Sequence, residues 1–110
     1  MSDATALRAF FGDAEHDFAL PPERILELER ATGAGIGALS RRVFAGDFGF
    51  RDLRETIRVG LVGGGMAPQA AAELVALYVD GRPLDEAHPV ATAILEGLWF
   101  GRPATQEAAE

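Results

Sequence analysis

Three consecutive glycines, Gly63, Gly64 and Gly65, constrain the fold of this chain more than any other feature. They follow an apolar segment with helical spacing, and Ala67 and Pro68 begin a second such segment directly after them. Glycine tolerates the left-handed backbone that closes a helix, and proline suits the first turn of the next helix. The glycine run therefore predicts a helix end and a tight turn between two helices with almost no linker.

A phosphate-binding loop is the other structure that a glycine run suggests. Such a loop needs a strand before the glycines and a Lys-Ser or Lys-Thr pair after them. Here a helical segment precedes the run, Met66 and Ala67 follow it, and the chain contains no lysine. The run therefore favours a structural turn, and we expect no bound cofactor.

Apolar side chains recur at helical spacing in five segments of the chain. The first opens with residues 21–23 and ends before Gly33. The others are residues 36–45, 50–62 and 68–79, and a last segment that begins at Glu86 or Pro89 and ends at Phe100. In the third segment, Phe50, Leu53, Ile57 and Leu61 form the expected inward stripe, while Asp52 and its charged neighbours are expected to face solvent.

Two segments near the start of the chain alternate between apolar and polar residues. They cover residues 6–11 and 16–20, and the turn-forming residues 12–15 separate them, which indicates a β-hairpin. An isolated hairpin is marginal in water, so it should pack on the helices. The expected fold class is mainly α, of the α+β type, with an N-terminal β-hairpin packed on a bundle of about five short helices.

The composition suits one small domain, which we place at residues 1–103, with a disordered tail at 104–110. The chain has no cysteine, no secretory signal pattern and no apolar run near the roughly 20 residues of a membrane span. We therefore expect a cytoplasmic protein that does not enter the membrane. Its net charge of −7 disfavours binding to nucleic acid.

The residues that usually carry catalysis or bind metal are scattered in this sequence. His16 and His88 are the only histidines, and they lie far apart without a carboxylate at metal-pair spacing. His88 stands at a predicted helix start, where we expect it to be exposed or near a cap. Ser40 has no histidine near it in sequence. We therefore expect no catalytic site, no metal site and no enzyme activity.

Leu98, Trp99 and Phe100 form the most suggestive apolar cluster. Three consecutive large residues cannot all point inward from one helix, so Trp99 or Phe100 should be exposed or should fold back onto the hairpin. In the first case they form a patch that binds another protein chain. In the second they pack against Phe10, Phe11 or Phe18 of the hairpin.

Arg54 and Arg58 lie four residues apart and share one face of the third predicted helix. Their aliphatic stems can cover apolar surface while the guanidinium groups stay in water. Alternatively, the pair anchors an acidic segment of a partner. Arg54 and Arg58 are therefore candidate partner-binding residues together with Leu98, Trp99 and Phe100.

The whole pattern of glycines and apolar positions resembles a family of known proteins. The resemblance is carried by residues 10–20, 26–29, 33–39 and 52–58, by the glycine run, and by residues 84–101. Together they are similar to the small tail protein of gene transfer agents and related siphophage-like particles. That family is described as a tail assembly chaperone and also as a tail tube protein.

The resemblance implies a non-enzymatic assembly factor in a bacterial host, which binds the tape measure protein and other tail proteins. A tape measure is long, helical and apolar, and a chaperone of this class coats it, often in many copies, until tube subunits replace it. Homo-oligomerisation and association with the particle are further implications. The alternatives are a structural component of the tail tube, which generally needs a larger β-sheet, and a small helical adaptor or regulatory module.

Overall fold

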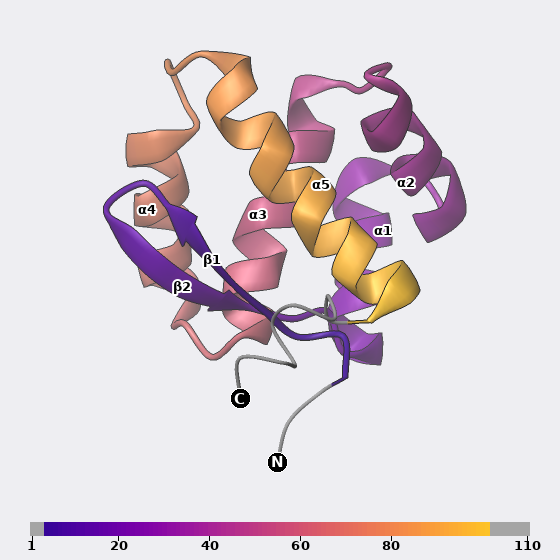
Figure 1. The fold of residues 1–110 in the computed structure, drawn as a ribbon, viewed down its shortest axis with the longest axis horizontal. Coiled ribbons are helices and arrows are strands. Elements are labelled where there is room, and N and C mark those ends of the chain that lie inside the picture. Colours follow the sequence, from indigo (N-terminus) through magenta and orange to yellow (C-terminus); the bar gives the residue numbers. More distant parts are fainter. Residues whose placement is uncertain (1–3, 102–110) are drawn as a thin grey trace.

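A computed structural model describes residues 4–101 of the chain as an antiparallel β-hairpin followed by five helices (Figure 1). The elements are β1 (Leu7–Phe11), β2 (Ala14–Phe18), α1 (Pro22–Thr32), α2 (Ile36–Ala45), α3 (Phe50–Gly63), α4 (Pro68–Tyr78) and α5 (Leu84–Phe100). The expected mainly α fold with an N-terminal hairpin is confirmed. The tail predicted at 104–110 lies outside the described residues, and the single-domain boundary stays a prediction.

The hairpin turns more sharply than the sequence indicated. Phe11 pairs with Ala14, so only Gly12 and Asp13 form the loop, and β2 begins two residues before the expected His16. Gly12 has a φ of 70°, the conformation that a tight two-residue turn needs at its first position. A Cβ at Gly12 would also overlap the ring of Tyr78. Glycine therefore both shapes the turn and lets it pack against α4.

The helix α3 lies at the centre of the molecule, in contact with the four other helices and with β2 (Figure 1). Leu53, Ile57 and Leu61 are fully buried along it, as the periodicity predicted. The expectation for Phe50 was wrong, because its side chain is half exposed at the first residue of the helix. The inward side of that first turn is occupied by Asp52 instead.

Asp52 was expected to face solvent, and the structure shows it buried. Its carboxylate accepts two hydrogen bonds from the Arg42 guanidinium, at 3.1 Å from Nε and 2.8 Å from Nη2. It also accepts the backbone N–H of Gly49 at 2.8 Å, in the turn that leads into α3. A carboxylate is favoured here because the first amides of a helix have no partner within the helix.

The glycine run closes α3 as predicted, but only its last member takes the left-handed side of backbone space. Gly63 is still helical, Gly64 has a φ of −81°, and Gly65 has a φ of 114°. The amide of Gly65 donates to the Val62 carbonyl, and that of Met66 to the Leu61 carbonyl. This pair of bonds satisfies the last carbonyls of the helix.

Glycine is required at positions 63 and 64 for a different reason: the chain that leaves β2 passes very close to them. A Cβ at Gly63 would overlap the Ala19 carbonyl, and one at Gly64 would overlap the Asp17 carbonyl. One turn earlier, the Gly60 carbonyl accepts the Ala19 N–H at 3.0 Å. Gly60, Gly63 and Gly64 lie three and four positions apart on α3, so they form one face of the helix, here called the glycine face.

The start of the last helix differs from the expectation. The helix α5 starts at Leu84, before both predicted starts, and contains Pro89 in its second turn. Proline in the second turn removes one backbone hydrogen bond close to the start of the helix, where the first amides have no partner within the helix. In α4 the buried positions are Ala71 and Val75, followed by Val79 just beyond it, whereas Leu77 is exposed.

Candidate functional site

The last turn of α5 carries the three apolar residues predicted to bind a partner. Leu98 packs against the core, whereas Trp99 is 53% exposed and Phe100 is 77% exposed. Of the two arrangements left open, exposure or folding back onto the hairpin, the structure therefore shows exposure for both aromatic residues. On the hairpin, Phe11 packs edge-on against Phe18 and against the ring of Tyr78.

Trp99 is exposed but held in place by a polar contact. Its indole Nε1 donates a hydrogen bond to the hydroxyl of Ser40 at 2.9 Å, and Ser40 is buried on α2. The bond fixes the ring across the contact between α2 and α5 and leaves about half of the residue open to solvent. A rigid aromatic ring of this kind loses little entropy when a partner covers it.

The two candidate arginines lie in a network of carboxylates. Arg54 binds Asp80 with two parallel hydrogen bonds of 2.9 and 3.1 Å. Arg58 binds Glu55 through Nε at 3.1 Å and through Nη2 at 2.6 Å. A longer ion pair of 3.7 Å joins Arg58 to Glu27 on α1. The network therefore links α3 to α1 and to the turn after α4.

The charges of this network reinforce one another. The hydrogen bond to Asp80 raises the pKa of Arg54, and the hydrogen bond to Glu55 raises the pKa of Arg58. Burial alone raises the pKa of Glu55, but the bonds and charges of Arg58 and Arg54 outweigh burial and hold it below its ordinary value. A role for the two arginines in partner binding stays a prediction.

The two histidines occupy structural positions. His88 was expected to be exposed or near a cap, but it is half-buried: its Nε2 lies 2.8 Å from the Val43 carbonyl, and its ring stacks on Phe48 at 4.9 Å. His16 contacts Asp13 at 3.0 Å across the hairpin turn. Residues 4–101 contain no cluster of three or more histidine, aspartate or glutamate side chains that could hold a metal ion.

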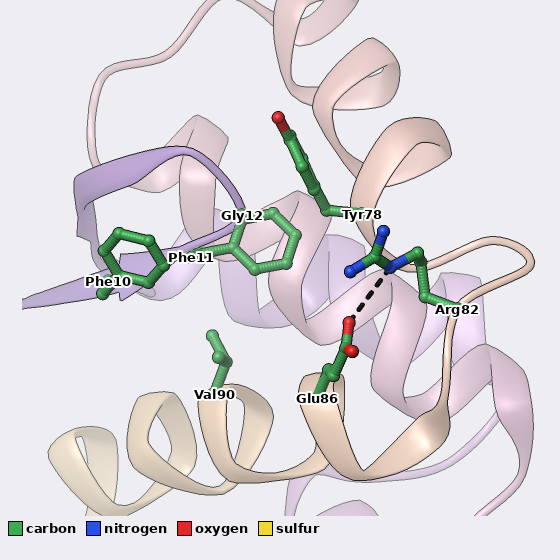
Figure 2. Close-up of a pocket in the computed structure, with 7 residues that line it drawn as sticks. All are labelled: Phe10, Phe11, Gly12, Tyr78, Arg82, Glu86 and Val90. Carbon is green, nitrogen blue, oxygen red and sulfur yellow. Dashed lines mark hydrogen bonds and ion pairs between the residues drawn. The ribbon is translucent and has the colours of Figure 1, made fainter.

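A pocket of about 340 Å³ opens between the hairpin turn and the facing ends of α4 and α5 (Figure 2). The hairpin contributes Phe10, Phe11 and Gly12, α4 and the following loop contribute Tyr78 and Arg82, and α5 contributes Glu86 and Val90. Figure 2 shows the Arg82–Glu86 ion pair, 3.1 Å long, at one side and the aromatic rings at the other. Sequence reasoning missed this pocket because its residues come from three separate segments.

Large apolar side chains are exposed elsewhere on the described surface as well. Besides Trp99 and Phe100, these are Phe10, Leu26, Phe44, Phe50, Leu77 and Leu84. No helix in the described part of the chain is long and apolar enough to cross a membrane.

A protein-family model described as "Phage tail tube protein, GTA-gp10" matches residues 4–101. The chain belongs to this family. Comparisons with curated proteins and with solved structures give no match.

Membership in the GTA-gp10 tail family confirms the resemblance to the tail proteins of gene transfer agents. It gives the chain a role in the phage tail and makes other tail proteins its partners. The match covers both strands of the hairpin and all five helices, so the glycine face and the exposed aromatic residues lie within the family domain.

Proposed function

We propose that this member of the GTA-gp10 tail family is a non-enzymatic tail assembly chaperone. It binds the tape measure protein in the bacterial cytoplasm and keeps it soluble while the tail forms. The observation that carries the proposal is the pair of adjacent exposed aromatic residues, Trp99 and Phe100, on a domain whose core is already filled. Exposed aromatic residues of this kind commonly act as anchors in protein interfaces.

A tape measure protein is a suitable client on physical grounds. A long apolar helix exposes surface that favours aggregation, and covering it contributes about 25 cal/mol per Å² of apolar area removed from water. The chaperone's net charge of −7 would then keep the complex soluble. The ion pairs of Arg54 and Arg58 within the domain leave Trp99 and Phe100 as the main proposed anchors, with the half-buried Leu98 packed against the core beside them.

A structural role in the tail tube is the second candidate, because the family description itself names a tail tube protein. Tube subunits generally join continuous β-sheets around a ring. The sheet in residues 4–101 has only two strands, which supports the chaperone over the tube subunit. Light scattering of the purified protein separates the two roles, since a tube subunit forms rings or tubes and a chaperone stays small without its client.

Co-expression with the tape measure gene of the same particle tests the proposal directly. We expect the tape measure protein to appear in the soluble fraction only when this chain is present, and to co-purify with it. If the soluble amount of tape measure is the same with and without the chain, the chaperone function is wrong.

Two single substitutions then locate the anchor. Phe100→Ala should reduce the co-purified tape measure several-fold while leaving the far-UV circular dichroism unchanged. Leu77→Ala is the matched control, because Leu77 is also largely exposed but lies on α4. Equal losses from the two variants would mean that the contact with the client is not centred on α5.

A further inference from the structure

Ser40 and Thr56 carry the two fully enclosed hydroxyl groups of residues 4–101, and they use them differently. The Thr56 hydroxyl donates at 2.6 Å to the backbone carbonyl of Asp52, four residues earlier on the same helix. That bond is a common one for a hydroxyl inside a helix. The Ser40 hydroxyl instead accepts the indole N–H of Trp99, which belongs to another helix and lies 59 positions away.

The core alone does not call for a serine at position 40. The side chain lies on the inner side of α2, next to the buried Leu39 and close to the buried Val43. Alanine has the higher helix propensity, and a buried hydroxyl lowers stability unless a hydrogen bond compensates for its lost contact with water. The bond to Trp99 supplies that compensation, so serine and alanine should give domains of similar stability. Serine at position 40 is therefore better explained by its effect on Trp99.

Trp99 lies in a part of α5 that would otherwise be loosely held. It is the last residue but one of the helix, between Gly97 and Gly101, and Gly101 leaves the helix with a φ of 80°. Glycine adds backbone freedom, and helix ends open more readily than helix centres. The 2.9 Å bond to Ser40 ties this last turn to α2. The ring is thus held in one orientation although about half of the residue is exposed.

The same bond determines which surface of the ring a partner meets. An indole has a single polar group, the Nε1–H donor. In Trp99 this donor is directed at the buried Ser40, so the exposed part of the ring offers carbon surface. A partner that covers the ring needs apolar side chains and no hydrogen-bond acceptor. An apolar helix meets this requirement, because its backbone carbonyls are bonded within the helix.

We infer that Ser40 is a positioning residue for partner binding. It holds Trp99 with its polar edge inward, so that the carbon surface of the ring faces the client. The inference rests on the proposed chaperone function, in which Trp99 is an anchor. Without Ser40 the ring would move among several rotamers, and the client would have to order it on binding. Ordering one free side chain at an interface weakens binding by about two- to tenfold.

The fluorescence of Ser40→Ala tests the positioning in the free protein. Trp99 is the only tryptophan of the chain, so its emission reports this ring alone. We expect a lower steady-state anisotropy and emission at longer wavelength, because the indole N–H is released to water. The far-UV circular dichroism and the urea midpoint should stay at the parent values or rise slightly. Thr56→Val is the matched control: it removes the other enclosed hydroxyl and should change neither fluorescence signal.

A competition experiment then measures the effect on binding. The parent and one variant, with different tags, are co-expressed with a limiting amount of the tape measure protein, and the bound ratio is determined. The parent should exceed Ser40→Ala by about two- to tenfold and should equal Thr56→Val. In a Trp99→Phe background, where the ring has no N–H, Ser40→Ala should have no further effect.

Several results would overturn the inference. These are an unchanged anisotropy in Ser40→Ala, equal competition with the parent, or a loss that persists in the Trp99→Phe background. A large fall in the urea midpoint would likewise assign Ser40 to the fold. Failure of the proposed function looks different, because the parent itself then recovers no soluble tape measure protein, and the inference falls with it.

Discussion

Replacing Gly63 by alanine tests how the hairpin is attached to the helices. Gly63 lies within α3, where alanine alone would be favoured over glycine by about 1 kcal/mol. The added Cβ, however, would overlap the backbone carbonyl of Ala19. A backbone atom cannot rotate away as a flexible side chain does, so the segment that leaves β2 has to move as a unit.

The size of the effect follows from what that movement breaks. Shifting Ala19 separates its N–H from the Gly60 carbonyl, 3.0 Å away, and an unpaired buried donor costs about 1–3 kcal/mol. Overpacking of the contact costs about 1–3 kcal/mol more. After subtracting about 1 kcal/mol for helix propensity, Gly63→Ala should destabilise the protein by about 3 kcal/mol.

Urea unfolding followed by far-UV circular dichroism measures this difference. With a urea slope of about 1–3 kcal/mol per M for a small protein, the midpoint should fall by about 1–3 M. Gly37→Ala is the control, since Gly37 lies in α2 and its Cβ would meet only the Arg41 side chain at 3.7 Å. That variant should be slightly more stable than the parent. A Gly63→Ala protein as stable as the parent would refute the packing explanation for the glycine face.

Two further substitutions test the buried charges. Asp52→Ala removes the partner of Arg42 and a cap of α3. It should lower the free energy of unfolding by about 2–4 kcal/mol, measured in urea melts at pH 7. A change below about 0.5 kcal/mol would contradict the role assigned to Asp52. Glu55→Gln should destabilise at pH 7 because the pKa of Glu55 is lowered in the folded state. A carboxylate whose pKa is lowered by folding stabilises the folded state fully above its pKa in the unfolded chain, about 4.3. This stabilisation is lost as the pH falls through its pKa in the folded state. The gap between parent and Glu55→Gln should therefore narrow below about pH 4 in urea melts, and an equal gap at pH 7 and pH 3 would exclude this linkage.

The elements of this fold were predictable where their signals are local in sequence. Gly33 and Gly46 end α1 and α2 in left-handed conformations with φ of 72° and 77°, as expected of glycines that follow a helical stripe. The start of α5 was misplaced because Pro89 suggests a first turn, whereas the helix accommodates it in the second. The hairpin was found, but its turn was judged too long because all the residues from Gly12 to Glu15 are compatible with turns.

The parts of the site that escaped prediction depend on distant partners. Asp52 looked like a surface residue because Arg42, ten positions away on another helix, is what permits its burial. The bond from Trp99 to Ser40 spans 59 positions, and no local pattern indicates it. The exposure of Trp99 and Phe100 could be predicted in part, since it follows from the limited width of a helix face.

Stability and partner binding are carried by different surfaces of this domain, and this makes the proposed function testable. The glycine face and the side chains around α3 hold the hairpin and helices together, whereas Phe100 is 77% exposed and contributes little to the core. A substitution at such a position usually changes the free energy of unfolding by no more than about 0.5 kcal/mol. If Phe100→Ala reduces the co-purified tape measure protein several-fold and leaves the free energy of unfolding unchanged, Phe100 therefore contacts the client itself. The same reduction in a variant that unfolds would assign Phe100 to the fold.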